Sequence, residues 1–323
     1  MTMAAVQTIG PIERAVLLRA LPIFDGVRTG QLAALAQLTD ERTAYAGQVL
    51  LAAGARVPGL AVLIDGAARV ERNGSPPARV EAPYGLGVPE LLAGRRSDTT
   101  ITAETPATIL AIDAAVWWDV LEEDFSLVVH VRRSLGRAHA LQAAACGAYD
   151  VTPPEAPIAA ALKPATDVPE MVDRLLHLHR VAALRPFGVA VLAALLGGET
   201  ERRVASGDAL FRAGDEASHV LVVAGGEVEC TAPDGTTPLR VGPGAMLGEN
   251  TALTGLVHAH DAVAVSDAMV LAIDAHRLWD VAEDHFHVAR ALLAQAARRL
   301  LALEPGAVSA DQERAVETRQ EIA

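Results

Sequence analysis

Two stretches of this chain are near copies of each other at an almost constant spacing. The sequence ILAIDAAVWWDVLEEDF at residues 109–125 returns as VLAIDAHRLWDVAEDHF at residues 270–286, an offset of 161. Upstream of both stretches, glycines recur in the same pattern at an offset of 160: Gly47, Gly54 and Gly66, then Gly207, Gly214 and Gly226. A repeat on this scale indicates two copies of one structural unit.

Between the glycines, the sequence pattern is typical of short strands joined by tight turns. Residues 219–242 contain two apolar, partly alternating runs, with hairpin signals at Gly225-Gly226 and Asp234-Gly235, and residues 60–83 repeat this arrangement. Apolar residues at helical spacing precede and follow each set of strands. We therefore predict a mainly β fold with flanking helices: two tandem antiparallel β-rolls of the jelly-roll type, each followed by a long α-helix.

The same pattern predicts the domain boundaries. The first roll with its helices is expected to span residues 12–146 and the second residues 171–304. Between them, residues 147–170 contain five prolines, which prevent a continuous helix, so we expect a linker with at most a short helix at 157–163. Residues 305–323 are expected to form a polar tail.

Composition excludes several classes of partner. The net charge is −13 and no segment concentrates Lys and Arg, so we expect no nucleic-acid surface. Only 20 residues follow Leu303, so we expect no helix-turn-helix module there. No run of 18 uncharged apolar residues occurs, so no membrane span is expected. The two cysteines form no CxxC motif, which favours a cytoplasmic location.

The order of helix, glycine-marked roll, Gly-Glu loop and closing helix resembles the cyclic nucleotide-binding domain family. This family includes catabolite-activator-type regulators and the tandem regulatory subunits of cAMP-dependent kinases. The resemblance covers about residues 16–138 and 175–303, and it is strongest in LFRAGDEASHVLVVAGGEVE at residues 210–229. It implies a loop in which a short helix directs its N–H groups at a cyclic phosphate, a glutamate accepts from the ribose, and an arginine pairs with the phosphate.

The second copy keeps part of this ligand-binding loop. Gly248-Glu249 match the Gly-Glu pair, but the arginine position falls at His258, and imidazole cannot reproduce the planar fork of a guanidinium. Losing the hydrogen bond between such an arginine and a charged phosphate costs about 1.5–3 kcal/mol of binding free energy. The residues expected to face a ligand are Gly248, Glu249, Asn250, Thr251, His258 and Ala259.

The first copy departs further from the family pattern. Gly87 is followed by Val88 instead of glutamate, Glu90 comes three residues after the glycine, and the arginine position falls at Ser97. Arg96 fills that position only if the loop carries a one-residue bulge. We expect a degenerate pocket built from Gly87, Val88, Arg96 and Ser97.

These observations leave two principal functions open. In the first, the chain is a non-enzymatic regulator whose second roll binds a cyclic nucleotide or another small anion and switches its C-terminal helix. In the second, neither pocket binds a ligand any longer, and the chain is a ligand-independent scaffold or adaptor in a protein assembly. The motif His258-Ala259-His260 raises a third function, a metal-dependent enzyme of the cupin type, but the following strand offers no further histidine. No cofactor or metal is expected beyond that nucleotide.

Two further expectations concern packing. The apolar stripe of residues 292–303 is suited to pairing with another helix, either between the repeats or with a protein partner in a homodimer or larger assembly. The repeated Trp-Asp pairs place Trp118 and Trp279 at equivalent positions, where each is expected to pack its helix on the roll.

Overall fold

The computed structural model describes residues 9–72, 74–154, 171–196, 201–233 and 235–303. The predicted short helix at 157–163 and the polar tail lie outside these residues. The chain divides into two compact units. The first contains the first roll, and the second consists of residues 136–295, so it includes the last part of the helix that follows the first roll. The predicted domain boundaries themselves stay a prediction.

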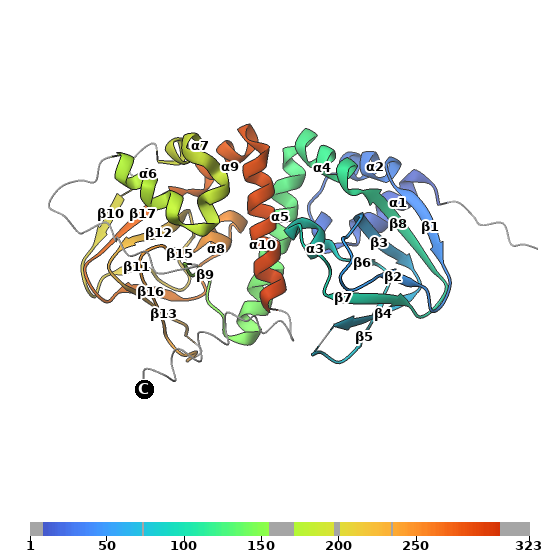
Figure 1. The fold of residues 1–323 in the computed structure, drawn as a ribbon, viewed down its shortest axis with the longest axis horizontal. Coiled ribbons are helices and arrows are strands. Elements are labelled where there is room, and N and C mark those ends of the chain that lie inside the picture. Colours follow the sequence, from blue (N-terminus) through green and yellow to red (C-terminus); the bar gives the residue numbers. More distant parts are fainter. Residues whose placement is uncertain (1–8, 73, 155–170, 197–200, 234, 304–323) are drawn as a thin grey trace, which may run out of the picture. The chain divides into compact units, whose positions relative to one another are not determined.

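The first roll consists of two antiparallel four-stranded sheets (Figure 1). One sheet has the strand order β1 (Asp40–Ala44), β8 (Ala107–Asp113), β3 (Gly59–Asp65) and β6 (Tyr84–Gly85). The other has the order β2 (Val49–Leu51), β7 (Thr99–Ala103), β4 (Ala67–Arg72) and β5 (Ala78–Glu81). The helical elements of this half are α1 (Pro11–Arg19), η1 (Pro22–Phe24), α2 (Thr29–Gln37), α3 (Val88–Ala93), α4 (Ala114–Glu123) and α5 (Phe125–Cys146).

The second roll repeats this topology and adds one strand. Its larger sheet has the order β10 (Glu201–Val204), β17 (Ala268–Asp274), β12 (His219–Gly225), β15 (Met246–Leu247) and β9 (Val151–Thr152). Its smaller sheet has the order β11 (Ala209–Phe211), β16 (Asp261–Ala264), β13 (Val228–Thr231) and β14 (Leu239–Val241). The helical elements are α6 (Met171–Arg180), η2 (Ala182–Phe187), α7 (Gly188–Leu195), α8 (Glu249–Thr254), α9 (Ala275–Asp284) and α10 (Phe286–Leu303). The predicted pair of antiparallel rolls is confirmed.

The repeated residues act at equivalent places in both rolls. The aspartate that ends the last strand caps the next helix: Asp113 accepts from the backbone of Ala115 at 2.8 Å, and Asp274 accepts from that of Arg277 at 2.9 Å. At the turn after β12, Gly226 has φ +78°, and a Cβ there would lie 2.4 Å from the carbonyl oxygen of residue 267. Glycine is therefore required at this turn for two separate reasons.

Each roll is closed by a short helix and then a long one, not by one continuous helix. The break falls at Asp124 in the first half and at His285 in the second, where the backbone leaves the helical conformation. Asp124 accepts from the Ser126 hydroxyl at 2.6 Å, which favours the start of a new helix there. Trp118 and Trp279 are half-buried, and their predicted packing role stays a prediction. The residue before Trp118 is the buried one: Trp117 is 0% exposed and meets Phe24 edge-on.

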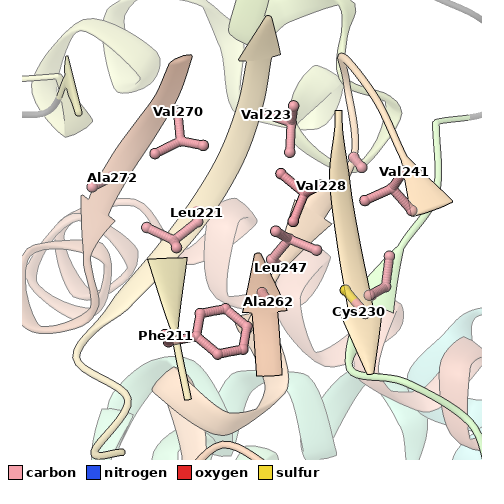
Figure 2. Packing of buried hydrophobic residues seen from close by; sticks show 12 residues of the cluster. Phe211, Leu221, Val223, Val228, Cys230, Val241, Leu247, Ala262, Val270 and Ala272 are labelled. Carbon is pink, nitrogen blue, oxygen red and sulfur yellow. The ribbon is translucent and has the colours of Figure 1, made fainter. Parts of the chain in front are cut away.

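The core of the second roll is filled by its own aliphatic side chains. Figure 2 shows side chains of this cluster gathered between the two sheets, with the ring of Phe211 at one end and the sulfur of Cys230 at another. Burial raises the pKa of the Cys230 thiol to about 12, so this cysteine behaves as a small apolar residue. Val151 of β9 belongs to the same cluster. A residue of the predicted linker is thus part of the core.

Candidate functional site

The loop between β15 and β16 has the predicted form. Gly248 adopts φ +68° and precedes α8, whose first residues are all buried. His258 forms backbone hydrogen bonds with Gly214 and Asp215 at 2.8 and 2.9 Å. In the first roll, Ser97 makes the equivalent pair of bonds at 2.7 and 2.9 Å. His258 and Ser97 thus make equivalent backbone bonds in the two copies.

The N–H groups at the start of α8 already hold a carboxylate of this chain. The backbone N–H of Asn250 donates to Oδ1 of Asp150 at 3.2 Å, and that of Thr251 donates to Oδ2 at 2.9 Å. The Thr251 hydroxyl lies 3.0 Å from the same Oδ2, and the N–H of Gly248 donates to the Asp150 carbonyl at 3.1 Å. Asp150 is 8% exposed. An internal anion thus binds where the family resemblance places a phosphate.

Other predicted ligand-binding groups of the loop are also engaged by protein. Glu249 is buried, and its carboxylate accepts from the Gln295 side chain of α10 at 3.3 Å. The amide of Asn250 donates to the carbonyl of Gly136 on α5 at 3.0 Å. These contacts join the loop to Gly136 and Gln295.

The two histidines of the H-x-H motif lie just before β16, and both rings contact Phe211. The His258 ring stacks on Phe211 with centroids 3.7 Å apart, and the His260 ring lies 5.5 Å from the same residue. Burial lowers the pKa of both imidazoles, opposed by the nearby charge of Asp150. His260 Nδ1 faces the Asp261 carbonyl at 3.1 Å, so in the neutral ring this nitrogen carries the proton.

These lowered pKa values predict a loss of stability in acid. A buried histidine whose pKa is lower in the folded state binds fewer protons than it does unfolded, so stability rises with pH. Besides Asp150, the carboxylates of Asp215 and Asp261 face His258 and His260 respectively, and both oppose the effect of burial. The second roll should therefore lose stability as the pH falls below 6.5, the ordinary histidine value.

Unfolding followed by circular dichroism between about pH 7 and pH 5 measures this effect. A His258→Phe/His260→Phe variant keeps aromatic packing and removes both titrations, so its melting temperature should change less over that range. An equal change in both proteins would show that other groups cause the acid sensitivity.

In the first roll, the helix that follows the glycine carries its own carboxylate. Gly87 precedes α3, and Pro89 in the first turn has no N–H to offer a ligand. Glu90 is 4% exposed; burial raises its pKa, opposed in part by a hydrogen bond from its own backbone N–H. Arg72 of β4 lies 4.0 Å from this carboxylate and 3.2 Å from Asp98. The guanidinium of Arg72 thus reaches this loop. Arg72 lies on a strand and not in the loop, however, and its guanidinium already contacts two carboxylates.

The remaining residues predicted for the first pocket do not replace the missing arginine. Arg96 is exposed and its guanidinium donates to the Gly54 carbonyl at 2.7 Å. Ser97, and not Arg96, makes the backbone bonds equivalent to those of His258, so a one-residue bulge does not bring Arg96 to that position. Ser97 is buried and its hydroxyl donates to the Thr99 carbonyl at 2.9 Å. Val88 is buried against the roll, where an apolar side chain offers a ribose no acceptor.

Sequence reasoning missed Asp150 and Arg72, because neither lies in the loop that carries the family pattern. Beside Asp150 lies a cavity of about 260 Å³, lined mainly by small residues that include Ala259. Among the described residues, no cluster of three or more His, Cys, Asp or Glu side chains is arranged to bind a metal ion. In the same part of the chain no single helix has the length and apolar character of a membrane span, although the bent pair 171–179 and 184–195 meets both criteria together.

Comparisons with known proteins point to one family. Residues 201–285 match the family model described as the cyclic nucleotide-binding domain. Curated protein sequences give no significant match.

Several solved structures align with the chain. The regulatory domain of Toxoplasma gondii PKA with cAMP is 12% identical, with 88% of this chain and 95% of that chain covered and a TM-score of 0.33. The regulatory subunit of a cAMP-independent protein kinase A from Trypanosoma brucei is 15% identical, with 94% and 92% covered and a TM-score of 0.33. The N-terminal domain of a transcriptional regulator from Streptomyces coelicolor is 28% identical, with 41% and 98% covered and a TM-score of 0.36. These TM-scores are low, so the assignment rests on the family model and on the loop described above.

The second roll of this chain belongs to the cyclic nucleotide-binding domain family.

Proposed function

We propose that this chain is a non-enzymatic regulatory protein whose second roll works without a cyclic nucleotide. The observation that carries the proposal is the contact of Asp150 with the N–H groups of Asn250 and Thr251. A nucleotide phosphate and this carboxylate would compete for the same donors, and the carboxylate is covalently attached to the chain. An attached competitor has an effective concentration in the millimolar range, so it disfavours a free ligand that lacks an arginine partner.

The first roll supports the same proposal. Pro89 removes one donor from the loop, and the carboxylate of Glu90 is buried there next to Arg72. A phosphate would bring a second negative charge close to a buried carboxylate, which raises the cost of binding. Both rolls therefore serve as structural modules in this proposal, in a protein whose cytoplasmic location stays a prediction.

The helix stripe is less available to a partner than its sequence indicates. Leu292 and Leu293 of α10 are 2% and 0% exposed within the chain. A dimer formed through this part of the stripe would first have to uncover both side chains. A partner surface is therefore expected elsewhere on the chain.

Titration of the purified protein with cAMP and cGMP tests the proposal. We expect no change in melting temperature and no heat of binding at millimolar nucleotide, because a ligand stabilises only the state that it binds. The His258→Arg variant should also fail to respond, since the new guanidinium lies near Asp150 and pairs with that carboxylate. A clear stabilisation of the wild-type protein by either nucleotide would instead select the sensor function.

A further inference from the structure

Residues 149–152 contact the second roll in the way that a bound peptide would. Val151–Thr152 pair antiparallel with Met246–Leu247 at the edge of the larger sheet. This strand has no counterpart among the described residues of the first roll, where the corresponding sheet ends at β6. The extra strand is therefore an addition to the roll and not part of its common topology.

Successive residues of this segment have specific partners. The Tyr149 hydroxyl lies 3.3 and 3.2 Å from the carbonyl oxygens of Thr236 and Thr237, and its ring meets His260 edge-on at 5.0 Å. Asp150 binds the start of α8, as described above. Val151 is 9% exposed and packs in the core. Backbone pairing gives such a complex affinity, and alternating side-chain sites give it specificity.

We propose that the second roll contains a binding site for a short extended peptide with the pattern aromatic–Asp–Val, filled in cis by residues 149–152. A partner protein that carries such a segment would take the site when the internal segment is released. A nucleotide would use the donors that hold Asp150, but it would pair neither with the sheet edge at Met246–Leu247 nor with the core position of Val151, which both fit a peptide. The inference goes beyond the proposed function, because a peptide site is compatible with either response to nucleotides.

The segment is short and is bounded on both sides by residues that do not continue its neighbouring elements. Two-residue strand β9 is followed directly by Pro153 and Pro154, which have no N–H and cannot extend the ladder. Before it, Gly147 at φ +68° separates the segment from α5. The segment is thus a short insert between a helix end and two prolines, and its exchange leaves both sheets of the roll intact.

The test uses a fluorescein-labelled peptide AYDVTP, which has the sequence of residues 148–153, and fluorescence polarisation. The protein is the full chain carrying Asp150→Ala and Val151→Gly, which removes two anchors of the internal segment. We expect this variant to bind AYDVTP at least tenfold more tightly than the wild type does, since the wild-type site is filled. The matched peptide AYAVTP should bind the variant at least tenfold more weakly, because it lacks the charged acceptor.

A folded variant that binds both peptides equally, or neither, would overturn the proposal. If this variant shows no cooperative unfolding, the single variant Asp150→Ala replaces it, with melting temperature as the readout. Unlabelled AYDVTP should then restore part of the lost stability, and AYAVTP should not. Equal restoration by sodium acetate would show a simple anion site and reject the peptide site.

Discussion

Replacing Asp150 by alanine should lower the free energy of unfolding of the second unit by about 3 kcal/mol. The substitution leaves two backbone N–H groups and the Thr251 hydroxyl without their carboxylate acceptor, in a place that is almost closed to solvent. Each unsatisfied buried donor costs about 1–3 kcal/mol. The total loss of stability stays near the lower end of the sum for these three donors. A water molecule can enter the space that the side chain leaves, and the cost of burying the charge is removed.

Thermal or urea unfolding measures this loss, which corresponds to roughly 6–12 °C for a unit of this size. The control is Asp150→Asn, which keeps the shape and one acceptor oxygen but not the charge. This variant should therefore lose less stability than Asp150→Ala. The difference between the two variants isolates the contribution of the negative charge at α8. If Asp150→Ala unfolds like the wild type, the carboxylate does not hold this loop, and the competition argument fails with it.

The double variant Asp150→Ala/His258→Arg should bind cAMP or cGMP at least tenfold more tightly than the wild type. The first substitution frees the N–H groups at the start of α8, and the second supplies a guanidinium at the position equivalent to Ser97 of the first roll. His258 already stacks on Phe211 at 3.7 Å, and an arginine can stack on the same ring while its fork faces a phosphate. Calorimetry of the wild type, the two single variants and the double variant gives each nucleotide affinity and the coupling free energy between the two substitutions.

The two single variants are the matched controls. Asp150→Ala lacks the arginine, and His258→Arg retains the competing carboxylate, so neither should bind nucleotide as tightly as the double variant. The coupling free energy between the two sites should therefore be favourable and well above the error of the cycle. Additive effects would mean that Asp150 does not compete with the ligand. The proposed loss of nucleotide binding in this pocket would then need another cause.

The repeat made the two rolls predictable, because the residues that build them act locally. Gly226 is required by its own turn, and Asp113 and Asp274 cap the helices that begin at the next residue. The common side of His258 and His260 follows instead from their contacts with Phe211, because both residues precede β16 and lie outside a strand. The repeat did not single out Trp117, which is fully buried while its neighbour Trp118 is half-buried, because the second copy has no tryptophan at the equivalent position.

The sequence alone thus determined the two rolls, their turns and the absence of an arginine in the Gly-Glu loop. It did not determine what occupies that loop. Asp150 and Thr251 are 101 residues apart, and their contact depends on the pairing of a two-residue strand with β15. No local pattern encodes such a pairing, because its free energy comes from burial of Val151 and from donors that another part of the chain supplies. Only the tertiary structure shows that the chain provides its own anion.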